Sequence, residues 1–473
     1  MISRLGLAIS RIFHRICPDP FVIAILLMAF TAALALAFGR FPQETSLWNR
    51  AALLLDSWRS DEGLWKLLGF GMQMCLVLVT GHALAATRPI KASVETIANW
   101  SRSTSGGAVL VCLVACITGL INWGLGLIVG ALLAREVGRS LTRRGTPVHY
   151  PLLAAAGYMG LLIFHGGLSG SAPLSATTVS GASKVLPQSA VALLGGGISL
   201  DRTLFSSLNF FVTGGMLVLL PLLFRLLSPA SASDMQPMDP ALVRMPVVLG
   251  NDDSTVVEYG DEIAGPSVPD RLDRSPVVVW LLAIPLVMAL LRYAQVKGLI
   301  NAQLNEVNAA MLAFGLILHG SPRKYMSAVE DGARDCAAIM IQFPIYAGIM
   351  ALMRDSGLLE ALTTAFTQLG TARTLPALSF VAATLVGLFV PSGGAQWGLQ
   401  GPIALQAGAQ AGVDPGHMLM SVAYGDELAN MLQPFWALPL LAITGAKARD
   451  IVGYTAIAMI VAGAWMFLGL LLL

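Results

Sequence analysis

The chain has 473 residues, of which 56% are hydrophobic and only 12% are charged. A soluble domain carries about 25% charged residues, so this composition excludes a soluble protein. It predicts an all-α polytopic membrane protein with the lipid bilayer as a partner. The formal net charge of +2 comes without any basic stripe, so nucleic acid is not expected as a partner.

Apolar runs of about the length that a bilayer requires recur along the chain. They cover 21–38, 65–86, 204–227, 276–293, 305–320, 336–353 and 450–473. The first run follows three arginines and superficially resembles a signal peptide. It has no small-residue cleavage site and is followed by many further runs, so we expect it to be the first membrane helix.

Two similar segments interrupt apolar runs that look too short to span a bilayer singly. The first, Asn122-Trp123-Gly124-Leu125-Gly126, separates the runs 108–121 and 125–134. The second, Gln396-Trp397-Gly398-Leu399-Gln400-Gly401, separates the runs 375–390 and 399–411. We therefore predict two re-entrant hairpins, at about 104–134 and 375–411, with these segments at their tips.

Each predicted hairpin is followed by an apolar region that is long enough to span but is broken by polar and glycine residues. The broken helices are expected at about 150–190 and 417–446, with breaks at 166–173 and 425–434. This order repeats, so we predict two structural repeats, 1–228 and 276–473. The residues between them, 229–275, contain six prolines, nine acidic and three basic residues, and are predicted to be a cytoplasmic linker.

The distribution of lysine and arginine predicts the orientation, since these residues favour the cytoplasmic side. It places the N-terminus in the cytoplasm and the C-terminus in the periplasm, as in a protein of the bacterial inner membrane. The first hairpin then opens from the cytoplasm and the second from the periplasm. The two repeats would therefore have inverted topology, which is common among secondary transporters.

Broken helices at membrane depth provide the expected binding chemistry. The N-terminus of a half-helix has free N–H donors and a partial positive charge, and it favours an anion. Ordinary helix packing is the alternative for any single small residue. The candidate substrate-binding residues are Asn122, Trp123, Gly124, Ser169, Ser171, Ser175, Ser392, Gln396, Trp397, Gly398, Asn430 and Gln433. The leading candidates for a carboxylate are Ser171, Asn122, Gln396 and Asn430.

Asp426 and Glu427 lie beside the second break in a region that is otherwise almost free of charge. An intramembrane carboxylate is costly and indicates function, although a carboxylate at a helix end can also reach the interface. Asp426 is expected to bind sodium, together with Asn122 and Asn430, or to carry a proton. His165 precedes the first break and is either a proton-relay residue or a packed histidine.

Several segments resemble the bacterial short-chain fatty acid transporter family, whose members are associated with acetoacetate and butyrate uptake. The resemblance runs along the whole chain. It rests on Cys17-Pro18-Asp19-Pro20-Phe21, on Gln396-Trp397-Gly398, on Gly425-Asp426 with Asn430 and Gln433-Pro434-Phe435-Trp436-Ala437-Leu438-Pro439, and on Lys447-Ala448-Arg449-Asp450.

This family is similar to a superfamily of ion-coupled carriers with two re-entrant hairpins and two broken helices. The resemblance implies a scaffold that forms a homodimer and an elevator-type movement of the transport domain. In some dicarboxylate carriers of that superfamily, paired Ser-Asn-Thr tips bind the substrate. Asn-Trp-Gly and Gln-Trp-Gly replace them here, which favours a smaller monocarboxylate with an apolar tail.

We therefore expect an ion-coupled secondary active transporter of short-chain fatty acids, acting by alternating access. The alternatives are a carrier of another organic anion, such as a dicarboxylate or an amino acid, and an anion channel. We expect no catalytic residue and no cofactor besides a coupling proton or Na⁺. An enzyme is not expected, since the sequence has no metal-ligand cluster, nucleophile motif or cofactor loop.

Overall fold

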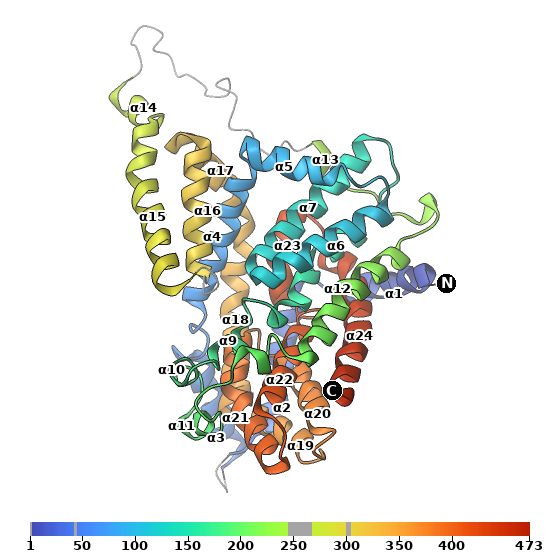
Figure 1. Cartoon of the computed structure of the whole chain (residues 1–473), viewed down its shortest axis with the longest axis vertical. Coiled ribbons are helices and arrows are strands. Elements are labelled where there is room, and N and C mark those ends of the chain that lie inside the picture. Colours follow the sequence, from blue (N-terminus) through green and yellow to red (C-terminus); the bar gives the residue numbers. More distant parts are fainter. Residues whose placement is uncertain (1, 42–44, 245–266, 299–303) are drawn as a thin grey trace.

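The computed structural model describes residues 2–41, 45–244, 267–298 and 304–473, and every regular element in these ranges is a helix (Figure 1). Part of the predicted linker, 245–266, lies outside the described residues. The all-α prediction is therefore confirmed over the part of the chain that the structure describes.

Within the described residues, seven helices are long and apolar enough to cross a membrane. They are α2 (Pro20–Phe38), α4 (Leu68–Ala85), α6 (Thr104–Ile121), α12 (Ser207–Leu227), α15 (Pro276–Lys297), α18 (Ala337–Asp355) and α24 (Ala448–Leu472). The predicted span at 305–320 is the shorter α16 (Leu304–His319). Only 11% of α15 and 17% of α2 is buried, so these helices offer apolar surface to lipid.

One set of helices, here called the outer group, stands side by side along the long axis of Figure 1. It comprises α2, α3 (Leu47–Arg59), α4, α15, α16, α17 (Pro322–Ala333), η6 (Arg334–Cys336) and α18. The short α5 (Arg88–Ala98) leads from α4 to the rest of the molecule, and α14 (Val268–Asp273) precedes α15. The extensive contacts of α4 with α16 and α17, and of α2 with α18, join the group.

The remaining helices form the inner group, which contains both predicted hairpins and both broken helices. Its first hairpin consists of α6 and α7 (Trp123–Arg143), which meet at Asn122. The Asn122 Oδ1 accepts from the N–H groups of Gly124 and Leu125 at 3.0 and 3.1 Å. This extended, capping residue ends one helix and begins the next. The helices are longer than the predicted runs, and α6 is itself long enough to span. The re-entrant character of this hairpin thus stays a prediction.

The second predicted hairpin consists of α20 (Leu375–Gly387) and α21 (Gly393–Ala411). The predicted tip was wrong, because Gln396 and the residues up to Gly401 lie inside α21. The turn lies at 388–392, and Ser392 caps α21 by accepting from the Ala395 N–H. The glycines of this segment serve close packing: a Cβ at Gly398 would lie 2.9 Å from the Val185 carbonyl oxygen. Ser392, and not Gln396, is therefore the counterpart of Asn122.

Both predicted breaks interrupt regular helix. After α8 (Tyr150–Gly157) the chain continues through η1 (Met159–Leu162) and η2 (Phe164–Gly166) into the short α9 (Ser171–Ser175). The second break separates α22 (Pro415–Ala429) from α23 (Pro434–Thr444), with Pro434 at the first helical position, where its missing N–H costs little. The remaining short elements are α1 (Ile2–Ile16), α10 (Val179–Ala182), α11 (Gln188–Ala192), η3 (Leu200–Arg202), η4 (Ala232–Asp234), α13 (Pro240–Arg244) and α19 (Leu358–Thr367).

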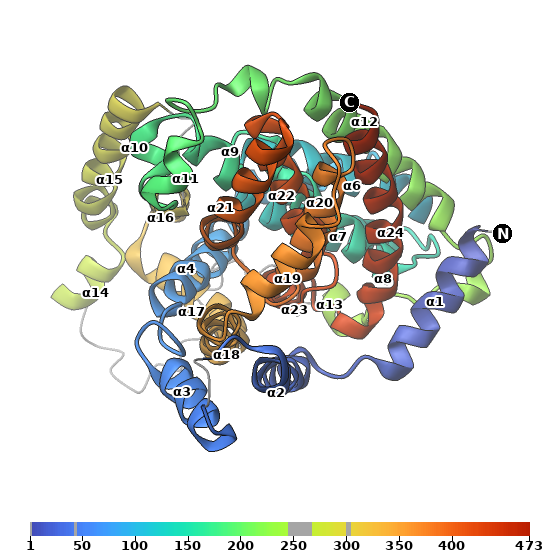
Figure 2. The same cartoon turned by 90° about the horizontal axis from the view of Figure 1, so that it is seen from below.

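The two hairpins lie in opposite halves of the molecule: α6 and α7 in the upper half of Figure 1, and α20 and α21 in its lower half. Seen from below, α21 and α22 lie near the centre, with α15, α4 and α18 of the outer group on one side and α24 and α12 on the other (Figure 2). The α22 helix packs against both α20 and α21. This arrangement brings the breaks together inside the inner group.

Candidate functional site

The two breaks contact each other directly. The hydroxyl of Tyr158 donates to the Asn430 carbonyl oxygen at 2.9 Å, and the Asn430 side-chain amide donates to the Leu161 carbonyl oxygen at 3.2 Å. Tyr158 and Asn430 are both buried. Each break therefore satisfies backbone carbonyl groups of the other, which lipid could not do.

A cluster of three ionisable side chains lies at this crossing. His165 Nε2 is 2.8 Å from Asp426 Oδ2, and the backbone N–H of His165 donates to Glu427 Oε2 at 2.8 Å. His165 and Glu427 are completely buried and Asp426 is 5% exposed. Within the described structure, His165 Nδ1 and Glu427 Oε1 have no hydrogen-bond partner. The sequence selected each residue separately, and the structure joins them in one buried site.

The N-terminus of α21 closes this cluster. A Cβ added at Gly393 would lie 2.7 Å from His165 Nε2 and 2.8 Å from Asp426 Oδ2, so the backbone of α21 touches the pair. A helix N-terminus favours negative charge, and α21 therefore stabilises the Asp426 carboxylate. Three elements meet here: η2, α22 and the start of α21.

The tip of the first hairpin reaches the first break. The Trp123 N–H donates to the Ser169 hydroxyl at 2.9 Å, and the Leu168 N–H donates to the Leu120 carbonyl oxygen at 2.7 Å. The Trp123 ring meets Trp436 of α23 edge to face, with centroids 5.2 Å apart. Asn122, Trp123 and Ser169, all predicted site residues, thus lie together with an aromatic wall.

Two predicted glutamines donate to backbone carbonyl groups of α20, the first helix of the second hairpin. The amide of Gln396 donates to the Ala383 carbonyl oxygen at 2.8 Å, and that of Gln433 donates to the Gly387 carbonyl oxygen at 2.7 Å. Both Oε1 atoms are buried and lack a partner among the described residues. Gly387 lies against both Gln396 and the Asp426 backbone. Unpaired acceptors in such a place are costly and indicate a site for a donor.

Other predicted residues do not join the cluster. The Ser175 hydroxyl donates to its own helix at Ala172, and Gly398 packs against Val185. Trp397 is fully buried inside the second hairpin. Ser171 begins α9. These positions serve local packing or helix initiation.

Sequence reasoning missed a polar network that holds the first break. The Asn209 amide of α12 donates to the Gly166 and Leu204 carbonyl oxygens at 2.9 and 2.7 Å. Its Oδ1 accepts from Tyr424, two residues before Asp426, and from Thr213. A single asparagine within the apolar run 204–227 was the signal that could have found it.

No group of three His, Cys, Asp or Glu side chains that could hold a metal ion occurs in the described ranges. The predicted sodium ligands are engaged with protein groups. Asn122 caps α7, the Asn430 carbonyl accepts from Tyr158, and Asp426 contacts His165. A sodium site that joins these residues stays a prediction.

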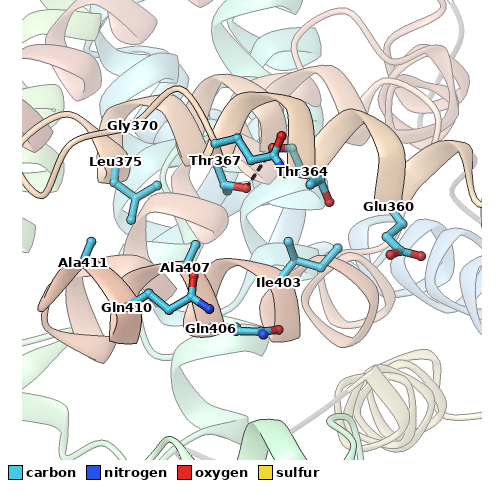
Figure 3. Close-up of a pocket in the computed structure, with 11 residues that line it drawn as sticks. Glu360, Thr364, Thr367, Gly370, Leu375, Ile403, Gln406, Ala407, Gln410 and Ala411 are labelled. Carbon is cyan, nitrogen blue, oxygen red and sulfur yellow. Dashed lines mark hydrogen bonds between the residues drawn. The ribbon is translucent and has the colours of Figure 1, made fainter.

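A cavity of about 490 Å³ lies between α19 and α21, away from this cluster (Figure 3). Its polar lining includes Thr364, Gln406 and Gln410. None of the cluster residues lines it. We therefore assign the candidate site to the crossing of the breaks and not to this cavity.

Spanning apolar helices and two interrupted helices that meet at a buried charged cluster define the class of this protein, a multi-pass helical membrane transporter. All 473 residues match the family described as "Short chain fatty acid transporter". The chain belongs to this family.

Two curated relatives are named as candidate short-chain fatty acid transporters. The one from Escherichia coli is 37% identical over 100% of both chains, and the one from Haemophilus influenzae is 34% identical over 99% of both. Among solved structures, the YdaH transporter of Alcanivorax borkumensis has a TM-score of 0.41 at 14% identity, covering 96% of this chain and 97% of that one. MtrF of Neisseria gonorrhoeae has a TM-score of 0.38 at 16% identity, covering 98% of this chain and 96% of that one.

Proposed function

We propose that this protein is an ion-coupled secondary active transporter that carries short-chain monocarboxylates across the bacterial inner membrane. The observation that carries the proposal is the buried cluster of His165, Asp426 and Glu427, placed where two broken helices cross in a member of this family. Buried ionisable groups at membrane depth are costly and are retained for function. Transport, and not catalysis, is the activity that this arrangement supports.

The substrate carboxylate would bind at the free N–H groups of the half-helices that begin beside the breaks. Two such ends, those of α21 and α23, begin next to Ser392 and Gln433, whereas the first N–H groups of α7 already donate to Ser169 and Asn122. Trp123 and Trp436 offer an apolar wall for a short aliphatic tail. A carboxylate and a tail of a few carbons match this combination of donors and aromatic rings.

The negative charges of the substrate and of the site explain why anion transport would be coupled to a cation. A substrate anion that arrives next to Asp426 and Glu427 would meet like charges in a buried site, which is strongly unfavourable. A proton shared by Asp426 and His165, or a sodium ion at Asp426, would remove this repulsion before the anion binds. Cotransport of cation and anion is therefore the expected mode.

Alternating access would move the inner group against the outer group in an elevator-type cycle. The location of the hairpins in opposite halves of the molecule supports a gate on each side. We further propose a homodimer, as the resemblance to the superfamily of ion-coupled carriers implies. The distribution of basic residues favours an N-terminus in the cytoplasm and a C-terminus in the periplasm.

Uptake of labelled butyrate and acetoacetate into proteoliposomes tests this proposal, with a proton or a sodium gradient imposed in turn. Saturable accumulation that one gradient drives is the expected result, and it names the coupling ion. Accumulation of a dicarboxylate or an amino acid instead would contradict the monocarboxylate assignment. Conductance without saturation or accumulation would indicate a channel.

A further inference from the structure

A cavity lies between the outer and inner groups, about one turn along α23 from the break. Its volume is about 630 Å³. Its walls come from the turn before α2, from η6 and α18, and from α23 and the loop before α24. We call it the vestibule.

The charges of the vestibule are mostly positive. Arg334, Lys447 and Arg449 line it, whereas Asp19 is its one described acidic residue and is occupied in capping α2 through the Phe21 N–H at 2.9 Å. The three cations form no ion pair with any residue in the described ranges. A low-dielectric cleft lined by one sign of charge attracts the opposite ion.

A neighbouring cavity of about 360 Å³ shares Lys447 and Arg449 with the vestibule. It also contains Asp239 and Asp450, of which Asp450 pairs with His14 at 3.3 Å and Asp239 accepts from the Ala241 N–H. These carboxylates are thus partly engaged elsewhere. The excess of positive charge in the vestibule remains.

The rest of the lining is apolar, with one polar exception. Leu438 and Leu441 of α23 face Ala338 of α18 across the cavity. Gln342 also lines it, is only 3% exposed, and its Oε1 has no partner within the described structure. The basic residues and the apolar wall suit a small amphipathic anion, whereas the Gln342 amide oxygen could accept only from a donor group of a ligand.

The vestibule is separated from the break by aromatic rings. The α23 helix runs from the break at Pro434 to the cavity at Leu438, and between them Phe435 stacks on Phe343 with centroids 3.9 Å apart. Tyr346 meets Phe435 edge to face at 5.2 Å. We infer that the vestibule is an anion-binding site for a carboxylate with a short apolar tail, next to this aromatic seal. This inference rests on the proposed function for its substrate class.

Cys17 lines the vestibule and serves as its reporter, since the other four cysteines are buried. Burial raises the pKa of the Cys17 thiol, so its labelling by N-ethylmaleimide is best followed at about pH 8.5. With the purified full chain, sodium butyrate should slow labelling relative to sodium chloride of equal ionic strength, whereas 1-butanol should not.

The double variant Arg334→Gln/Arg449→Gln should abolish this protection. In proteoliposomes it should raise the KM for butyrate several-fold, keep Vmax, and weaken the dependence of KM on salt. Arg88→Gln is the matched control, because Arg88 is an exposed arginine outside the vestibule. It should retain protection and KM.

Equal protection by chloride and butyrate, or unchanged protection in the double variant, would overturn the inference. The two proposals fail separately. If the wild-type protein shows protection without uptake, the transport proposal fails and the vestibule stands. If it shows uptake without protection, the vestibule fails and the transport proposal stands.

Discussion

His165 contacts two carboxylates at once, one through its ring and one through its backbone N–H. A carboxylate buried without such partners would be prohibitively costly in a membrane. Asp426 and Glu427 therefore have different surroundings: one shares a titratable hydrogen bond, and the other accepts from a fixed backbone donor. This difference favours Asp426 as the residue whose charge changes during transport.

Asp426→Asn should abolish gradient-driven accumulation of butyrate, because the amide keeps the size of the side chain and removes its charge. Proteoliposome uptake measures this effect. Asp414→Asn on the same helix is the matched control, since asparagine retains the cap of α22 and only the exposed pair with Arg202 is lost. Normal concentrative uptake by the Asp426 variant would refute its role.

Asn209→Ala should destabilise the protein, because it leaves the part-buried Gly166 and the buried Leu204 carbonyl groups without their donor. Each unpaired group costs about 1–3 kcal/mol. Thermal unfolding in detergent should show a clearly lowered Tm, whereas Ser207→Ala, at an exposed position of α12, should leave the Tm unchanged. Equal Tm values for the two variants would show that the network does not hold the break.

At the scale of the elements, the second hairpin contacts the His165–Asp426 pair on one side and borders a cavity on the other. Gly393 lets the start of α21 touch His165 and Asp426. On its other side, α21 faces the polar cavity that separates it from α19 (Figure 3). An element with close polar contact on one face and a cavity on the other is suited to act as a gate.

Gly393→Ala should lower the initial rate of uptake strongly, since the new Cβ would lie within 2.8 Å of both side chains of the pair. Inserting a methyl group into such a site costs about 1–3 kcal/mol. Gly394→Ala is a sharp control, because a Cβ there would meet nothing within 4 Å. Similar rates for the two variants would contradict the close contact that we describe.

At the scale of the whole molecule, the outer and inner groups meet at an aromatic boundary. Phe343 of α18 belongs to the outer group, and Phe435 of α23 belongs to the inner group. Flat stacked rings permit sliding better than interlocked side chains, which suits an interface that moves. An elevator-type cycle requires this boundary to break and re-form.

Cross-linking across this boundary tests the movement. In a chain without its native cysteines, an oxidised Phe343→Cys/Phe435→Cys pair should block uptake, and reduction should restore it. The control pair Phe70→Cys/Phe343→Cys joins two helices of the outer group, whose rings are 5.9 Å apart, and should leave uptake unchanged. Full uptake by the first cross-linked pair would exclude relative movement at this boundary.

The sequence by itself determined the class of the protein, most of its spans and the two breaks, whereas the role of Asp426 stays a prediction. These properties depend on hydropathy and on helix-breaking residues, which act over one or two turns. It did not place the tip of the second hairpin, because glycines that permit a turn also permit close packing, and here they pack against Val185.

Only the tertiary structure decided which residues meet. His165 and Asp426 are 261 positions apart, and Asn209 binds the first break across a gap of 43 residues. The vestibule likewise draws its cations from η6 and from the start of α24 with the residue before it. Such contacts depend on how whole helices pack, and no local pattern in the chain encodes which distant polar groups will satisfy one another.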